Sequence, residues 1–266
     1  MREKTACIIS EKLKIVCIWL VGLGEHKDIL TDIIATLDLD AQVRDIRQGI
    51  FHTGVLTRRC GLAATLPKDA LEQTPPLIKE SGHLLEKSAS ELVQMSFSGS
   101  ILEAAIGMAS INSLIEVDGE QCVELNAGDL LAEKGKDKKV VIVGHFPFVS
   151  GLRGISRELN VIEKNPRDGD LTEEQADVFL PEADVVGVTG SALTNHTMDH
   201  LLSVCNPKAY VVVLGDTTPI SPVLFEYGVD AISGTMVIDS ERALRSVSQG
   251  ANFRQISGIR LFTMMR

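Results

Sequence analysis

The spacing of apolar residues differs between the amino-terminal part of this chain, called the front below, and the carboxyl-terminal part, called the rear. Near the start, apolar residues recur at helical spacing, at Ile29, Leu30, Ile33, Ile34 and Leu37, which predicts an amphipathic helix over residues 27–37. Residues 43–66 instead alternate with a period of two and contain many β-branched side chains, which indicates strands. This pattern predicts a hairpin that turns near residues 58–61.

A second helix is predicted behind Ser100. Ser100 followed by Glu103 fits a capping box, in which the serine oxygen and the glutamate satisfy the first amides of a helix. The helix behind it has one side made of small residues between Ala104 and Ala109, which lets another element approach closely. We favour packing within the chain for this side, and an interface between copies of the chain is the alternative.

The rear of the chain repeats a strand, loop and helix pattern. Its strands are nearly continuous apolar runs, which are typical of parallel strands covered on both faces by crossover helices. The predicted strands are residues 140–143, 161–163, 184–189, 210–214 and 231–233, and the predicted helices are residues 152–159, 195–204 and 222–227. This order predicts a Rossmann-like, doubly wound α/β sheet.

The charged run EKGKDKK at residues 133–139 marks the expected boundary between two domains. We therefore expect a smaller α+β domain over residues 1–134 and the Rossmann-like α/β domain over residues 135–266. A length of 266 residues is consistent with two domains, because domains commonly contain about 100–200 residues.

Composition narrows the classes of function. A formal net charge of −10 argues against nucleic acid as a partner, because such partners call for clustered Lys and Arg. The five cysteines are scattered and form no C-x-x-C pair, so we expect reduced thiols in a cytoplasmic protein. The apolar stretch at residues 15–24 is too short to span a membrane and lacks a cleavage site, so a buried first element is favoured over a signal peptide and no membrane partner is expected.

Polar and glycine residues follow successive predicted strands. Because ligands bind at the carboxyl ends of the strands in an open parallel sheet, these loops are the candidate ligand site. The candidates are Gly144, His145, Glu163, Thr189, Gly190, Ser191, Asn195, Asp216, Thr217 and Thr218. Glycine lets backbone amides approach a ligand and hydroxyl groups donate hydrogen bonds, although any one of these residues could instead cap a helix or turn the chain.

His145 and Glu163 are the candidate metal ligands, because neutral imidazole and carboxylate both coordinate divalent transition metals. Further donors could come from His52, Cys60, Glu103, His196 and His200. Glu163 also lies about twenty residues after Gly144, where a dinucleotide-binding fold holds a ribose hydroxyl. The first loop lacks G-x-G-x-x-G, so no dehydrogenase is predicted, but a modified nucleotide or a methyl donor stays open.

Three extended blocks of the sequence carry a family resemblance. They are VGHFP at residues 143–147, ILEAAIGMASIN at residues 101–112 and TPISPVLFEYG at residues 218–228. The chain resembles, in order from about residue 54 to residue 237, the family named "putative heavy-metal chelation". The resemblance implies an enolase amino-terminal-like domain before the Rossmann-like domain, with the site in the cleft between them.

The resemblance also implies site residues. It points to the strand-end residues given above on the Rossmann side, and it adds Glu103 and Asn112 from the front domain. Asp216 stands where the family pattern leads one to expect proline, and an additional carboxylate there favours a cation and repels an anion.

Three hypotheses follow from the sequence. The first is a protein that binds a divalent transition metal or a metal-chelating small molecule between its domains. The second is an enzyme with a nucleotide-like or S-adenosylmethionine-like cofactor, and the third is a scaffold without catalysis. The expected partners are thus a small-molecule or metal ligand and, where the small-residue helix is an interface, a second copy of the chain.

Overall fold

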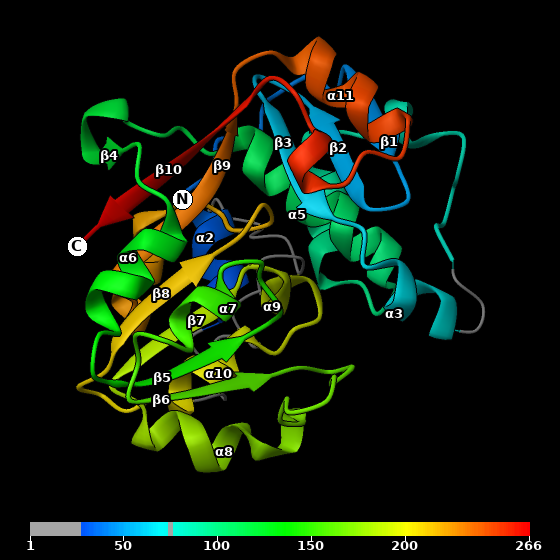
Figure 1. The fold of residues 1–266 in the computed structure, drawn as a ribbon. Coiled ribbons are helices and arrows are strands. Elements are labelled where there is room, and N and C mark those ends of the chain that lie inside the picture. Colours follow the sequence, from blue (N-terminus) through cyan, green and yellow to red (C-terminus); the bar gives the residue numbers. More distant parts are fainter. Residues whose placement is uncertain (1–27, 74–76) are drawn as a thin grey trace, which may run out of the picture.

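The computed structural model describes residues 28–73 and 77–266. The apolar segment at residues 15–24 lies outside these residues. The described residues form two sheets, one of three strands and one of seven, in a mixed α/β fold (Figure 1). Within the described part of the chain, no helix has both the length and the apolar character needed to cross a membrane.

The small sheet is antiparallel and comes from the front of the chain. Its strands are β1 (Asp45–Gln48), β2 (His52–Leu56) and β3 (Cys60–Ala64), in that order. Strands β2 and β3 pair from His52 with Ala64 to Leu56 with Cys60, so the hairpin turns through residues 57–59. The predicted hairpin is confirmed. Helix α2 (Ile29–Ala35) precedes the sheet and confirms the first predicted helix.

Helix α5 (Ile101–Leu114) packs on the small sheet. A Cβ atom at Gly107 would lie 2.0 Å from the Ser96 nitrogen, and one at Gly61 of β3 would lie 2.1 Å from the Ala109 oxygen. The small residues of α5 therefore serve close packing within the chain. The shorter helices of this region are α3 (Pro67–Glu72), η1 (Leu84–Glu86), α4 (Ala89–Gln94) and η2 (Met95–Phe97).

The predicted capping box of α5 is wrong. Ser100 is the N-cap residue, but its side chain makes no capping hydrogen bond and donates instead to the Leu77 carbonyl. The Glu103 carboxylate accepts from the Lys79 amide at 2.7 Å and from the Ser98 hydroxyl at 2.6 Å. Burial of Glu103 explains this arrangement, because a buried carboxylate requires hydrogen-bond donors close to it.

The large sheet has the strand order β4-β10-β9-β8-β7-β5-β6. Strands β5 to β9 run parallel, whereas β10 is antiparallel to β9 and to β4. The strands are β4 (Cys122–Val123), β5 (Lys139–Val143), β6 (Glu158–Ile162), β7 (Val185–Thr189), β8 (Tyr210–Leu214), β9 (Ala231–Val237) and β10 (Ile259–Met265). The expected fold class, a Rossmann-like sheet behind a smaller α+β unit, is confirmed.

Both faces of the large sheet are covered. Val140 and Ile142 of β5 pack with one cluster of apolar residues, and Val141 and Val143 pack with the other. Helices α6 (Ala127–Lys134) and α7 (Val149–Leu152) cover the first face, and α10 (Met198–Val204) packs into the second. This burial on two faces explains the continuous apolar runs in the sequence.

Two predicted helices of the large unit differ from the structure. No helix covers residues 152–159 as expected. The single turn α7 ends at Leu152, and β6 begins at Glu158, opposite Lys139. The helix expected over residues 195–204 begins only at Met198, as α10, because His196 adopts a left-handed conformation with φ +61°. A separate short helix, α9 (Ser191–Thr194), precedes it. His196 and His200 are therefore not neighbours on one helix face.

The last part of the chain joins the two sheets. Helix α11 (Ser240–Ser248) leaves the large sheet and packs on β1 and β2. Figure 1 shows it over the small sheet, before the chain returns along β10. Helix α6, although before residue 135, packs on the large sheet, and the domain boundary at residues 134 and 135 stays a prediction. The remaining short helices are η3 (Gly119–Gln121), η4 (Glu173–Gln175), α8 (Ala176–Phe179), η5 (Leu180–Glu182), η6 (Pro222–Tyr227) and η7 (Phe253–Gln255).

Candidate functional site

A cavity of about 310 Å³ lies where the order of the parallel strands reverses. In the chain, β5 is followed by β6 and then by β7, but in the sheet β5 lies between β6 and β7. The connections that leave β5 and β7 therefore run in different directions and leave a crevice between these two strands. We name this crevice the polar cavity. Seven of the predicted site residues line it: Gly144, His145, Glu163, Thr189, Ser191, Asn195 and Asp216.

The loops after β5 and β7 form the floor of the polar cavity. Gly144 has φ +103°, a conformation that glycine adopts without strain, and a Cβ atom there would come within 3.0 Å of the Thr189 side chain. The Thr189 hydroxyl accepts a hydrogen bond from the Ser191 amide at 3.3 Å. These contacts keep the two loops close together at the ends of their strands.

His145 and Glu163 follow the neighbouring strands β5 and β6. The Nδ1 atom of His145 lies 3.5 Å from a carboxylate oxygen of Asp170, whose side chain is only 2% exposed. The same Asp170 oxygen accepts from the Arg167 amide at 3.0 Å. Asp170 thus places a buried carboxylate beside the imidazole ring. The Glu163 carboxylate has no hydrogen-bond or ion-pair partner among residues 28–73 and 77–266.

The front unit, which consists of the small sheet and the helices from α2 to α5, supplies the wall of the polar cavity opposite the large sheet. Leu66 and Asp69, at the start of α3, line the polar cavity together with the large-sheet residues. The Asp69 carboxylate forms an ion pair with Lys164, which follows β6. Asp69 raises the pKa of Lys164, mainly through their hydrogen bond. This ion pair closes one side of the cavity across the two units.

Asp216 and His52 form a second ion pair across the units. The His52 Nε2 atom lies 2.5 Å from an Asp216 carboxylate oxygen, and His52 Nδ1 is 3.3 Å from the Ala251 carbonyl oxygen. Burial of the ring lowers the pKa of His52, but the hydrogen bond to Asp216 and the Asp216 charge outweigh burial and leave this pKa above its usual value. His52, from β2, therefore holds Asp216, which follows β8, at the edge of the cavity.

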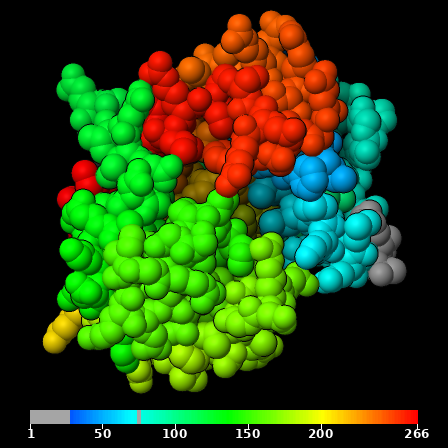
Figure 2. Space-filling model, in the orientation of Figure 1, coloured from blue at the N-terminus to red at the C-terminus, as the bar shows by residue number. Residues whose placement is uncertain are grey.

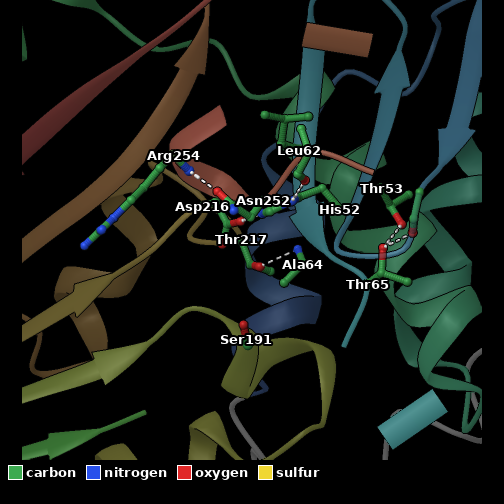
Figure 3. A network of polar contacts seen from close by, with 12 residues as sticks. His52, Thr53, Leu62, Ala64, Thr65, Ser191, Asp216, Thr217, Asn252 and Arg254 are labelled. Carbon is green, nitrogen blue, oxygen red and sulfur yellow. Dashed lines mark hydrogen bonds and ion pairs between the residues drawn. The ribbon is translucent and has the colours of Figure 1, made fainter. Parts of the chain in front are cut away.

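The other predicted site residues do not line the polar cavity. Thr217 and Asn112 join the two units, and the rest have packing contacts within one unit. The Thr217 hydroxyl accepts from the Ala64 amide at 2.9 Å (Figure 3). The Asn112 side chain donates to the carbonyl oxygens of Leu62 and Thr217. A Cβ atom at Gly190 would lie 2.4 Å from the Thr218 hydroxyl, so this glycine allows close packing. Glu103 is buried beside Ser98 within the front unit.

A metal centre made only of protein ligands is not formed within the described residues. No three His, Cys, Asp or Glu side chains converge there on a position where a metal ion could be held. His145, Glu163, Glu173 and Asp216 nevertheless face one cavity. This arrangement offers donors to a metal ion that already carries other ligands, because three or four protein ligands are needed to enclose a bare transition metal ion.

Several residues of the cavity are absent from the sequence-based prediction. Asp69 comes from a short helix of the front unit, and Glu173 is the first residue of η4. Asp170, which contacts the cavity residue His145, lies in the loop after β6. The sequence gives no signal for them, because they follow no predicted strand directly. The sequence indicates His52 only as a possible metal donor, whereas the structure places it as the partner of Asp216.

Comparison with known proteins decides the family. A model of the DUF364 family, described as "Putative heavy-metal chelation", matches residues 126–266, and a DUF4213 model with the same description matches residues 31–115. The chain belongs to this family. The predicted membership is confirmed, and both the front unit and the large sheet are covered by matches.

The chain matches individual proteins over most of their length. The chain is similar to an uncharacterized protein of Methanocaldococcus jannaschii, with 27% identity over 84% of this chain and 89% of the relative. A crystal structure of a DUF364 protein with unknown function from Desulfitobacterium hafniense has a TM-score of 0.80 at 27% identity, over 90% of this chain and 98% of that one. A second one, from Pyrococcus horikoshii, has a TM-score of 0.75 at 23% identity, over the same shares of the chains.

Proposed function

We propose that the chain binds a divalent transition metal ion, carried as a complex with a small chelating molecule, in the polar cavity. The observation that supports this proposal most is that His145 and Glu163, at the ends of adjacent strands, line one cavity together with Asp216. An imidazole and two carboxylates suit such metals. The family description, heavy-metal chelation, agrees with this donor set.

The spacing of the donors favours a chelate over a bare ion. The described residues contain no convergent group of three donors, so the protein alone leaves coordination positions open. A small chelating molecule fills those positions and brings its own bulk into the cleft between the units. The carboxylate of Glu173 on the wall would then help to balance the positive charge of the complex.

Calorimetric titration of the purified, metal-free protein with Zn²⁺, Ni²⁺ and Co²⁺, each alone and with a small chelator, tests the proposal. We expect binding by the wild type and at least a tenfold loss in the double variant His145→Ala, Glu163→Gln, because the loss of a residue that merely orients a metal ligand typically already costs about 10-fold to 100-fold in affinity. The matched control is His200→Ala, Asp177→Asn, which alters an ion pair on exposed helix surfaces. Absence of wild-type binding to every metal, or equal binding by both double variants, would contradict the proposal.

A second function is supported by one feature of the fold. The polar cavity occupies the switch point at which Rossmann-like sheets bind nucleotides, and Glu163 ends the second parallel strand, where such sheets place a ribose-binding acid. A thermal-shift screen of nucleotides and S-adenosylmethionine tests this alternative. A ligand present at one hundred times its dissociation constant should add about 2.7 kcal/mol of stability. No shift with any of these compounds would remove the alternative.

A further inference from the structure

A second and larger cavity lies beside the polar cavity. It has a volume of about 690 Å³ and lies at the carboxyl end of β8, beside Ser233 and Gly234 in the middle of β9. We name it the aromatic cavity, for its walls of Phe146, Phe148 and Phe253, which are completed by Leu214 and Leu261. Figure 2 shows a hollow between the red carboxyl-terminal segment and the green segment below it, with yellow-brown atoms at its floor.

The aromatic side chains form a fixed wall. The rings of Phe146 and Phe148 are stacked, with centroids 5.2 Å apart and planes inclined by 11°. Gly128 of α6 lies directly behind Phe148, because a Cβ atom there would come within 2.9 Å of the ring. Phe253 reaches the cavity from a separate segment, η7. Aromatic groups on two separate segments suit a flat ring, since offset stacked and edge-to-face contacts are both favourable.

The aromatic cavity also has one unmatched positive charge. Arg254 lines the cavity, is exposed, and forms no ion pair with any residue in the described part of the chain. In Figure 3 its side chain extends away from Asp216. A guanidinium group binds carboxylate, sulfonate and phosphate groups through paired hydrogen bonds. The ligand of this cavity should therefore carry an anionic group at the end that faces Arg254.

The two cavities are joined by shared residues. His145, Phe146 and Asp216 line both of them. The geometry points to a planar aromatic anion as the ligand of the aromatic cavity, with its anionic group on Arg254 and its opposite edge at His145 and Asp216. If the proposed function holds, on which this last step rests, that edge carries the donor atoms that chelate the metal.

Quinoline-5-sulfonate without metal tests the aromatic cavity by itself. This probe has two flat rings and one sulfonate, and it lacks the hydroxyl group that would chelate a metal. We expect it to bind the full chain in calorimetric titration and to bind about tenfold more weakly to Arg254→Gln, which loses a charge-assisted hydrogen bond. Arg157→Gln is the matched control, because Arg157 pairs with Asp184 and lines neither cavity. It should bind the probe as the wild type does.

A filling variant supplies an independent check. Leu261 is 40% exposed on β10 and lines the aromatic cavity, so Leu261→Trp can occupy the cavity without removing core packing. We expect this variant to lose probe binding and to bind Zn²⁺ as the wild type does. The inference would be overturned if the wild type did not bind quinoline-5-sulfonate. It would also be overturned if Arg254→Gln and Leu261→Trp both bound this probe as tightly as the wild type does.

A second probe separates this inference from the proposed function. 8-Hydroxyquinoline-5-sulfonate has the same rings and sulfonate and also chelates Zn²⁺ through its nitrogen and hydroxyl oxygen. We expect Zn²⁺ to raise its affinity at least tenfold in the wild type and not in His145→Ala, Glu163→Gln. Binding of both probes with no effect of Zn²⁺ would support the aromatic cavity and contradict the metal function. Zn²⁺ binding with no binding of either probe would do the reverse.

Discussion

The ion pair between His52 and Asp216 joins the two units beside the candidate site. The two side chains are 6% and 15% exposed, come from different sheets, and meet beside both cavities. Because charged groups of low exposure need a partner of opposite charge, each residue depends on the other. This pair therefore connects the stability of the fold to the electrostatics of the candidate site.

The pair predicts a pH dependence of stability. The pKa of His52 is raised above the usual value of 6.5, so the pair contributes fully below about pH 6.5 and its contribution falls as the pH rises through the raised pKa. We expect Asp216→Asn to lower the free energy of unfolding by about 1.5–3 kcal/mol at pH 6, the range for a hydrogen bond to a charged group. The difference should shrink towards pH 9, as measured by urea unfolding.

Titration of the His52 ring protons by NMR provides the direct readout. The pKa of His52 should lie above 6.5 in the wild type and should fall in Asp216→Asn, because burial then acts without the compensating charge. Asp177→Asn, which alters the exposed pair with His200, should leave the unfolding profile nearly unchanged. Parallel pH profiles for the wild type and Asp216→Asn would contradict this account.

Among the elements, the packing of α5 on β3 sets the position of the small sheet. Gly61 faces the backbone of α5, where a Cβ atom would lie 2.1 Å from the Ala109 oxygen and 2.3 Å from the Ser113 nitrogen. Backbone atoms cannot move aside as a flexible side chain can. Strand β3 also carries Ala64, whose amide donates to Thr217, so a shift of this strand would disturb the contact with the large sheet.

Gly61→Ala should therefore destabilise the protein. We expect a loss of about 1–3 kcal/mol or more from overpacking, measured by urea unfolding. Gly151→Ala is the control, because nothing lies within 4 Å of a Cβ atom at this position of α7 and alanine favours the helix by about 0.5–1 kcal/mol. A loss of less than 0.5 kcal/mol in Gly61→Ala would show that α5 and β3 are not held this closely.

At the scale of the whole molecule, the two units are interlocked and not simply joined by a linker. Helix α11 leaves the large sheet to cover β1 and β2, and Leu62 of β3 packs with Ala243 and Val247 of α11 in one apolar cluster. The contacts of Thr217 with Ala64 and Asn112 hold the small sheet against the loop after β8. We therefore expect the units to unfold in one transition.

Thr217→Val tests this coupling. The substitution keeps the shape of the side chain but leaves the Ala64 amide without its acceptor, which should cost about 1–3 kcal/mol for a buried donor. Thr217→Ser retains the hydroxyl group and should lose less. Circular dichroism during urea unfolding should show one transition for all three proteins. Two separate transitions in the wild type would contradict the interlocking of the units.

The sequence by itself determined the elements whose burial has a clear period. The run at residues 210–214 predicts β8 with its observed bounds, because a strand buried on both faces has apolar residues at every position. It also determined the side chains at the ends of the strands, seven of which line one cavity. It did not predict α11 or β10, and it placed a helix over residues 152–159 where β6 begins.

The tertiary structure decided everything that depends on which segments meet. A periodic pattern shows that a face is buried but does not show what buries it, so the pairing of His52 with Asp216 and of Asp69 with Lys164 has no sequence signal. The apolar spacing around residue 158 is helical, but this residue pairs with Lys139 in the large sheet. The backbone hydrogen bonds of a sheet join residues distant in the chain, so local spacing does not reveal them. The aromatic cavity arises in the same way, from segments that only the fold brings together.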